Sequence, residues 1–197
     1  MANIADVSYR IVGDKKELRE IHKVLRYLER RKTPVVKTGW GKMWLGDLVT
    51  KLGGNPSDMD CRGRILDFYY VAKEGELGID YESAWCEKTE LREFLEERFP
   101  SVTVYYKEEE PLMGCFYIKD PTGRFFPERF FLDYYEDQVY FKSLEECAAY
   151  VSGILGIVVA PQISAISDAL ERASEEDREK YYNLYRFEVE QCSPDGE

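Results

Sequence analysis

The chain opens with alternating apolar and polar side chains and then changes to a helical repeat. Residues 4–12 alternate, which is typical of a strand with one buried face. Asp14, with Glu17 three residues later, forms a capping-box pattern and predicts a helix over residues 15–31. Apolar residues recur along this helix at steps of three and four: Leu18, Ile21, Leu25 and Leu28. The pattern therefore predicts a strand followed by an amphipathic helix.

The predicted helix also carries a basic stripe on its other side. Its members are spaced by three or four residues and share one face: Lys15, Arg19, Lys23, Arg26 and Arg30. Such a stripe is either a solvated helix face or a binding surface for an acidic partner. His22 lies beside the apolar stripe, and we expect a packing or surface histidine rather than a metal ligand, because no second histidine could complete a site.

Residues 33–60 interrupt the regular pattern and predict an insertion. Thr33-Pro34 breaks the helix, and residues 43–52 are spaced like a short second helix. Gly53-Gly54-Asn55-Pro56 then has strong turn chemistry. We therefore expect the insertion to contain one short helix between two loops.

The next segments complete a recognisable order of elements. Residues 64–73 and 77–83 predict a hairpin around Glu74-Gly75, residues 89–99 a helix with Thr89 as its N-cap, and residues 102–108 a strand. The order β-α-β-β-α-β over residues 3–109 is typical of the ferredoxin-like fold, an antiparallel four-stranded sheet with both helices on one face. We therefore predict an α+β protein with a ferredoxin-like domain over residues 1–110.

Residues 111–192 predict an aromatic hairpin and a mainly helical extension. Residues 113–118 and 125–132 are read as the hairpin strands, joined by Asp120-Pro121-Thr122-Gly123. Helices are predicted from the capping box at Ser143, from the spacing that begins at Ile163, and over residues 174–189. Two further segments are the apolar run 154–160, expected to be a buried strand or helix, and the tail 193–197, expected to be frayed.

Composition narrows the class of protein. The chain has 197 residues, of which 44% are apolar and 33% charged, as in globular domains. No stretch approaches the ~20 apolar residues of a membrane span, and the N-terminus lacks a secretory pattern. The cysteines are odd in number and contain no CxxC pair: Cys61, Cys86, Cys115, Cys147 and Cys192. We therefore expect a cytoplasmic protein with reduced thiols and no contact with a membrane.

Charge is distributed unevenly along the chain. Residues 1–44 carry 11 Lys and Arg against 5 Asp and Glu, a net charge of +6. The remaining residues carry −17, and the whole chain −11. A basic quarter on an acidic body is consistent with binding an acidic partner or a nucleic acid through the basic stripe. An acidic body that imitates DNA is a third interpretation.

Two short aromatic motifs resemble a known family. Residues 40–44, Trp-Gly-Lys-Met-Trp, and residues 81–85, Tyr-Glu-Ser-Ala-Trp, resemble the Trp-Gly-x-x-Trp and aromatic-x-Thr/Ser-Ala-Trp motifs of plasmid- and phage-borne proteins with a YubB-type ferredoxin-like domain. The spacing to Phe99-Pro100 and to Glu109-Glu110-Pro111 is also similar. The chain departs from the family after Trp85, where Cys86-Glu87-Lys88 replaces Ser-Pro-Pro. The resemblance implies a ferredoxin-like fold and a mobile-element origin for residues 3–130, but no catalytic residues.

The sequence offers little catalytic chemistry. It contains neither a P-loop nor a Gly-x-Gly-x-x-Gly motif, so we expect no nucleotide cofactor. Its acidic clusters lack EF-hand spacing, so we expect no metal. Asp80 and Glu82 share a strand face but are expected to be solvated. Cys86, just before a predicted helix, is the one weak nucleophile candidate.

Aromatic side chains are the remaining binding candidates. Trp40, Trp44 and Trp85 flank loops or element ends, where they can line a pocket for a partner or plug the junction of insertion and sheet. Phe68-Tyr69-Tyr70 is expected on a central strand, where one or two rings either face an open sheet and can stack on RNA or are covered by the C-terminal helices. We therefore predict a non-enzymatic binding module of a mobile element with a macromolecular partner, a protein first and a nucleic acid second. The alternatives are the acidic DNA mimic and a Cys86-dependent enzyme.

Overall fold

The computed structural model describes residues 3–190, so the predicted tail 193–197 lies outside the described residues. Within this range the chain contains five α-helices and nine strands, which confirms the α+β class. It divides into two compact units, Met1–Cys115 and Phe116–Glu197. In the described part, no helix has the length and apolar character needed to cross a membrane.

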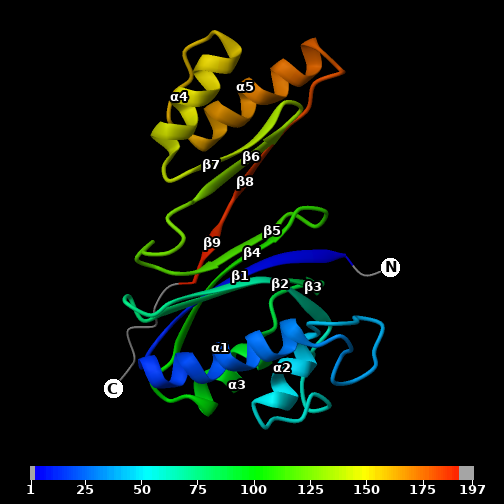
Figure 1. Ribbon diagram of the computed structural model, residues 1–197. Coiled ribbons are helices and arrows are strands. Elements are labelled where there is room, and N and C mark those ends of the chain that lie inside the picture. Colours follow the sequence, from blue (N-terminus) through cyan, green and yellow to red (C-terminus); the bar gives the residue numbers. More distant parts are fainter. Residues whose placement is uncertain (1–2, 191–197) are drawn as a thin grey trace. The chain divides into compact units, whose positions relative to one another are not determined.

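The first unit is built from one antiparallel sheet and three helices. In chain order its elements are β1 (Ile4–Val12), α1 (Lys15–Arg30), α2 (Leu45–Lys51), β2 (Gly63–Val71), β3 (Glu76–Ala84), α3 (Thr89–Arg98) and β4 (Thr103–Glu110). The strands are ordered β2-β3-β1-β4, and each neighbouring pair is antiparallel. The three helices cover one face of this sheet (Figure 1).

The alternation in β1 places its apolar side chains against the helices. Val7 pairs with Tyr81 and Ile11 with Leu77, and all four side chains are buried. The apolar stripe of α1 packs into the same core: Leu18, Ile21, Leu25 and Leu28 are each at most 2% exposed. The predicted strand, the predicted helix and its apolar stripe are therefore confirmed.

Ser101, which follows α3, changes the predicted cap of α1. The Asp14 carboxylate accepts a hydrogen bond from the Lys16 N–H at 2.7 Å, as an N-cap does. The Glu17 carboxylate, however, accepts from the Ser101 N–H at 3.1 Å and from its hydroxyl at 2.6 Å. In a capping box Glu17 would accept from the Asp14 N–H. That part of the prediction is wrong, because Ser101 supplies the donors that Glu17 binds. The cap of α1 thereby ties the helix to the segment before β4.

A buried carboxylate organises the insertion between α1 and β2. Asp47, which is 1% exposed in α2, accepts hydrogen bonds from the Val35 N–H at 3.0 Å and the Val36 N–H at 2.9 Å. Gly53 follows the helix with φ at +90°, a conformation that glycine adopts without steric cost. The predicted short helix is thus confirmed, and Asp47 ties the preceding loop to it.

The second unit contains two helices and shorter strands. Its elements are β5 (Cys115–Lys119, which begins on the last residue of the first unit), β6 (Phe130–Tyr134), β7 (Asp137–Phe141), α4 (Leu144–Leu155), α5 (Ile163–Glu176), β8 (Tyr182–Arg186) and β9 (Glu188–Val189). The strands β7-β6-β8 form an antiparallel sheet, and β5 pairs with β9 in parallel. The helices pack on the three-stranded sheet over a core that includes Leu132, Val151 and Ile166.

The predicted aromatic hairpin of residues 113–118 and 125–132 is wrong. β5 pairs with β9, whereas β6 pairs with β7 and β8. The turn after β5 does form, but the Asp120 carboxylate then accepts from the Phe125 N–H at 2.6 Å and the Phe126 N–H at 2.9 Å. Backbone donors that bind a side chain cannot join a strand ladder, so this segment stays irregular.

The mainly helical extension is also wrong in part. The predicted helix over residues 174–189 is replaced by β8 and β9, because Tyr182 and Leu184 pack under the helices at the two-residue spacing of a strand. The apolar run 154–160 is neither a strand nor a continuous helix. α4 ends at Gly156, with φ at +68°, and Val158 is fully exposed.

Candidate functional site

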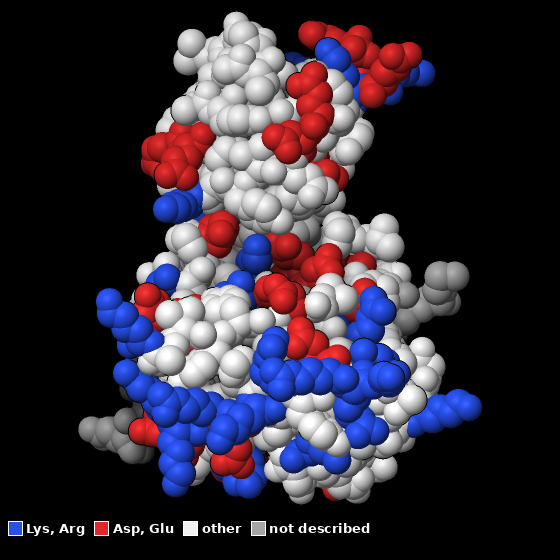
Figure 2. Space-filling view, in the orientation of Figure 1, with Lys and Arg blue, Asp and Glu red and all other residues white. Residues whose placement is uncertain are grey.

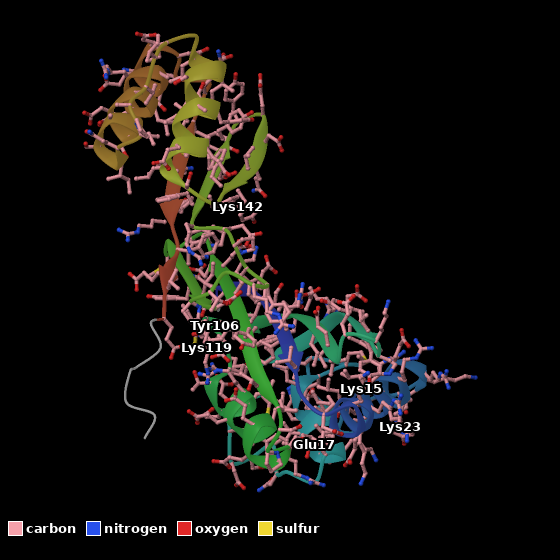
Figure 3. The ribbon with its side chains drawn as sticks, turned by 90° about the vertical axis from the view of Figure 1, so that its left-hand side faces the viewer. Lys15, Glu17, Lys23, Tyr106, Lys119 and Lys142 are labelled. Atoms are coloured by element: carbon pink, nitrogen blue, oxygen red, sulfur yellow. The ribbon has the colours of Figure 1, made fainter. Side chains whose placement is uncertain are left out.

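The basic stripe of α1 forms an exposed face. All of its members are solvent-exposed, and Figure 2 shows Lys and Arg side chains gathered over this helix: Lys15, Arg19, Lys23, Arg26 and Arg30. Arg26 pairs with Glu29 at 2.7 Å, and within the described residues the other four have no ion-pair partner. Because a helix rises 1.5 Å per residue, the stripe is roughly 22 Å long. Figure 3 marks Lys15 and Lys23 on it.

An exposed tyrosine near the end of this helix was missed by sequence reasoning. The Tyr27 side chain is 45% exposed. The Arg31 guanidinium lies 5.4 Å and the Lys51 ammonium 5.3 Å from the centre of its ring, within the range of cation–π attraction. Arg31 also donates to the Tyr27 hydroxyl at 2.7 Å. The i,i+4 spacing of Tyr27 and Arg31 was the available signal. We define the stripe together with Tyr27 as the basic face.

His22 packs as predicted. Its ring lies 5.9 Å from the Phe68 ring and 5.3 Å from the Tyr70 ring, measured between centroids. Burial, and then the positive charge of Arg26, lower the pKa of the imidazole below its usual value. His22 is therefore neutral at pH 7 and adds no charge to the basic face.

The aromatic run of β2 does not lie on a central strand, and that prediction is wrong. β2 is at an edge of the first unit's sheet. Phe68 and Tyr70 turn toward α1, where they meet His22. Tyr69 lies on the other face, with the Arg10 guanidinium 5.3 Å from its ring centre and its hydroxyl donating to Glu76 at 2.5 Å. The rings are therefore divided between the two faces and form no single stacking platform.

The three tryptophans do not form one aromatic cluster. In the described part of the chain, no ring contact joins two of them. Trp44 is half-buried against the core of the first unit, and its ring covers Gly46 so closely that an added Cβ would lie 2.4 Å from it. Trp85 is 47% exposed at the end of β3, with φ at +76°. Trp40 lies partly exposed in the insertion. Their contact with a partner stays a prediction.

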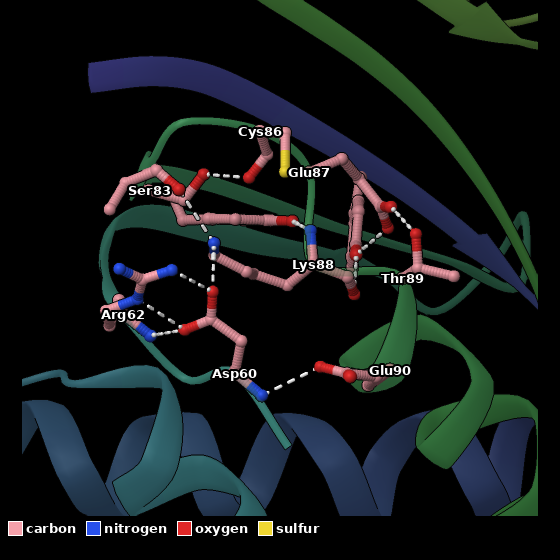
Figure 4. A network of polar contacts seen from close by, with 11 residues as sticks. Asp60, Arg62, Ser83, Cys86, Glu87, Lys88, Thr89 and Glu90 are labelled. Carbon is pink, nitrogen blue, oxygen red and sulfur yellow. Dashed lines mark hydrogen bonds and ion pairs between the residues drawn. The ribbon is translucent and has the colours of Figure 1, made fainter. Parts of the chain in front are cut away.

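A buried lysine joins the insertion to the segment between β3 and α3 (Figure 4). The Lys88 side chain is 2% exposed, and its ammonium lies 2.9 Å from the Asp60 carboxylate and 2.8 Å from the Ala84 carbonyl oxygen. Arg62 also pairs with Asp60 at 2.9 Å. These bonds lower the pKa of the Asp60 carboxyl far below its usual value, the Arg62 bond most strongly. The charges therefore hold one another in place.

Glu87 forms the second half of this network. Its carboxylate accepts from the hydroxyls of Tyr9 and Thr89 and from Arg92, whose Nε lies 3.3 Å away. Thr89 therefore binds Glu87 instead of capping α3, whose N-cap is Lys88, so the predicted Thr89 cap is wrong. No sequence signal marks the network, because Glu87 and Lys88 resemble solvated loop charges. The described acceptors and donors of this network bind one another, so the network joins the insertion, β1 and the start of α3.

Cys86 lies on the exposed side of this network, but its surroundings oppose a thiolate. Desolvation is the largest influence and raises the pKa of the thiol, while Lys88 lowers it and Glu108 and Glu87 raise it further. Burial also raises the pKa values of Cys61 and Cys147, each to about 11. An activated nucleophile needs a lowered pKa, so these surroundings favour an ordinary thiol.

We expect Cys86 to react slowly with iodoacetamide at pH 7, no faster than free glutathione. Since the thiolate is the reactive form, its rate should rise roughly tenfold per pH unit to beyond pH 9. Peptide mapping by mass spectrometry measures this rate for Cys86 separately from the other cysteines. A rate that reached its plateau below pH 8 would contradict this and revive the Cys-dependent enzyme.

The acidic candidates are paired with arginines. Asp80 lies 2.9 Å from Arg10, and Glu82 lies 3.0 Å from Arg64. Over the described range 3–190, no group of three or more His, Cys, Asp or Glu side chains is placed to hold a metal ion. Asp80 and Glu82 are therefore engaged in part-exposed ion pairs on the strand β3.

Comparisons with known proteins name no relative. No family model matches the chain, and no curated protein matches it. One structural match is the crystal structure of an unknown protein from Galdieria sulphuraria, with 11% sequence identity, covering 94% of this chain and 99% of that chain. Its TM-score is 0.26, which carries no argument about fold or function.

Proposed function

We propose that the chain is a non-enzymatic binding module that engages an acidic macromolecular partner through the basic face of α1. One observation carries this proposal: four exposed cations on one helix have no ion-pair partner among the described residues. A surface that only needed solubility would mix both signs of charge. Unpaired cations aligned over roughly 22 Å instead attract a complementary acidic surface.

The partner is a protein rather than a nucleic acid. Tyr27 stands beside Arg31 with 45% of its side chain exposed, and tyrosine and arginine are the residues most enriched at the energetic centres of protein interfaces. The chain's net charge of −11 opposes long-range attraction to any acidic partner, and most strongly to a nucleic acid, because the phosphate backbone has a higher charge density than an acidic protein surface. Nucleic-acid binding is therefore the second reading, and mimicry of DNA by the acidic body the third.

We further propose that the first unit is ferredoxin-like and that the protein is an accessory module of a mobile element. The β1-α1-β2-β3-α3-β4 order and the β2-β3-β1-β4 strand order support the fold. The resemblance of residues 40–44 and 81–85 to YubB-type proteins supports the origin. Neither point depends on the identity of the partner.

Charge reversal on the basic face tests the proposed function. In affinity capture from host lysate after nuclease treatment, we expect Arg19→Glu/Lys23→Glu to retain its partner at least about tenfold less than the wild type. The matched control is Lys73→Glu/Arg178→Glu, which changes the net charge equally at two exposed sites outside the basic face. Quantitative mass spectrometry compares the three captures, and thermal unfolding checks that both variants fold.

The capture distinguishes the three readings. Equal loss in both variants, or no loss in either, would overturn a role for the basic face. Loss of the partner on nuclease treatment of the wild type would favour nucleic-acid binding. A partner that duplex DNA displaces from the wild type, with both variants unaffected, would favour DNA mimicry.

A further inference from the structure

A hollow of about 610 Å³ in the second unit is lined by three basic side chains. Arg129, Lys142 and Arg186 share its wall with Phe130, Phe187 and Glu188. Its volume is within the 300–1,000 Å³ typical of pockets for small molecules. Figure 3 marks Lys142 just after β7.

The antiparallel sheet explains why these cations meet. The start of β6 lies beside the ends of β7 and β8, since Phe130 pairs with both Phe141 and Arg186. The ladder continues one residue further, because the Arg129 N–H donates to the Phe141 carbonyl at 2.8 Å and the Phe187 N–H to the Arg129 carbonyl at 3.0 Å. Arg129 just before β6, Lys142 just after β7 and Arg186 at the end of β8 therefore lie at the same end of the sheet.

Arg129 is held in position before any ligand binds. Its guanidinium donates to the carbonyl oxygens of Phe126 at 2.8 Å, Glu128 at 2.7 Å and, more weakly, Asp120 at 3.5 Å. These acceptors are neutral, and among residues 3–190 the Arg129 guanidinium has no ion-pair partner. A fixed guanidinium loses little conformational entropy on binding an anion.

Lys142 and Arg186 supply exposed positive charge beside this fixed group. Both are exposed, and within the part of the chain that the structure describes neither has an ion-pair partner. The second unit carries only 8 Lys and Arg against 17 Asp and Glu over residues 116–197. Three of its few cations thus line one hollow in an otherwise acidic unit.

We propose that this hollow binds a small organic phosphate that also carries hydroxyl groups. Arg129, Lys142 and Arg186 would contact the phosphate oxygens, because guanidinium and ammonium groups form strong charge-assisted hydrogen bonds with them. Glu188 would accept from a hydroxyl of the ligand, which separates this ligand from a bare anion. Phe130 and Phe187 form the apolar wall. The site is independent of the basic face of α1.

Calorimetric titration with ribose 5-phosphate tests this site. At about 50 mM salt we expect binding to the full chain, and at least about tenfold weaker binding to Lys142→Gln/Arg186→Gln. Lys119→Gln/Arg178→Gln removes the same charge from residues outside the hollow lining and should bind like the wild type. Ribose alone should not bind, and inorganic phosphate should bind more weakly than ribose 5-phosphate.

Each other result overturns the proposal. Absence of binding to the folded wild type excludes the site for this probe's chemistry. If both variants bound ribose 5-phosphate equally weakly, the net charge of the chain would explain the loss and the hollow would have no specific role. If inorganic phosphate bound as tightly as ribose 5-phosphate, the proposed organic ligand and the proposed role of Glu188 would both be rejected. None of these results bears on the capture experiment, whose variants change Arg19 and Lys23.

Discussion

Replacement of Glu87 by alanine is expected to lower the free energy of unfolding by about 3 kcal/mol. The Glu87 carboxylate is nearly inaccessible to solvent, and it binds Arg92 and the hydroxyls of Tyr9 and Thr89. Removing one member of a buried charged pair leaves the other without compensation, which costs about 3–5 kcal/mol. The lower end applies because Arg92 keeps Glu96 at 3.8 Å, and the Tyr9 hydroxyl keeps the Lys88 carbonyl at 3.2 Å.

Urea denaturation followed by tryptophan fluorescence measures this loss, because all three tryptophans belong to the first unit. Glu93→Ala is the matched control, since Glu93 lies exposed on α3, and its change should stay within about 0.5 kcal/mol. Glu87→Gln keeps an acceptor for the Tyr9 hydroxyl, so its loss in the free energy of unfolding should lie between those of Glu87→Ala and Glu93→Ala. Equal effects of Glu87→Ala and Glu93→Ala would mean that the buried network contributes nothing.

The second large effect is expected at Asp120, in the second unit. Its side chain is inaccessible to solvent and accepts from the backbone N–H groups of Phe125 and Phe126 and from the Thr122 hydroxyl at 3.1 Å. Asp120→Ala removes the acceptor from all three donors. Unsatisfied buried donors cost about 1–3 kcal/mol each, less where water enters, so we expect a loss of about 2–3 kcal/mol. Circular dichroism during urea denaturation measures it.

The pH dependence of this loss follows from the ionisation of Asp120. Burial alone would raise the pKa of this carboxyl, but the hydrogen bonds from the N–H groups of Phe126, Phe125 and Arg124 and from the Thr122 hydroxyl together lower it below 3.8. Because the folded pKa is depressed, the stabilisation is present above about pH 4 and is lost as the pH falls through the lower, folded value. The difference between the wild type and Asp120→Ala should therefore shrink below pH 4. A difference that stayed constant from pH 7 to pH 2 would exclude the ionised carboxylate as its source.

Exposed Asp168 provides the control in the same unit. Asp168→Ala should change the free energy of unfolding by less than about 1 kcal/mol. Hydrogen exchange adds a local measurement, because the Phe125 and Phe126 amides should exchange faster in Asp120→Ala. Unchanged exchange at these two amides would show that another acceptor or water replaces the carboxylate.

Sequence reasoning worked where one periodicity dominated a long segment. The strand Ile4–Val12 and the apolar stripe of α1 each repeat a single spacing, and that spacing identifies their buried faces directly. The exposed basic side of α1 is the other half of the same pattern. In residues 181–189 two periodicities compete. A helical spacing fits Tyr181, Leu184, Tyr185 and Val189, whereas the two-residue spacing of a strand fits Tyr182 and Leu184. Pairing with β6 decided the outcome.

The buried polar network could not be predicted from local pattern. Lys88 and Asp60 are 28 residues apart, and Tyr9 and Glu87 are 78 apart. Each is unremarkable in its own segment, and only the folded sheet brings them together. The hollow in the second unit has a similar origin. Arg129 and Lys142 flank the local hairpin of β6 and β7, but Arg186 joins them only when β8 pairs with β6, a strand far away in the sequence.

The pairing of β5 with β9 determines which unit can complete its folding first while the chain is being synthesised. Tyr117 and Ile118 pair with Glu188 and Val189, so the first and last strands of the second unit must both be present before that pair forms. The elements of the first unit precede residue 115, apart from the start of β5. At about 5–20 residues per second, translation reaches Val189 roughly 4–15 s later. During synthesis, the elements of the first unit, including the basic face of α1, are therefore made seconds before β9 is complete.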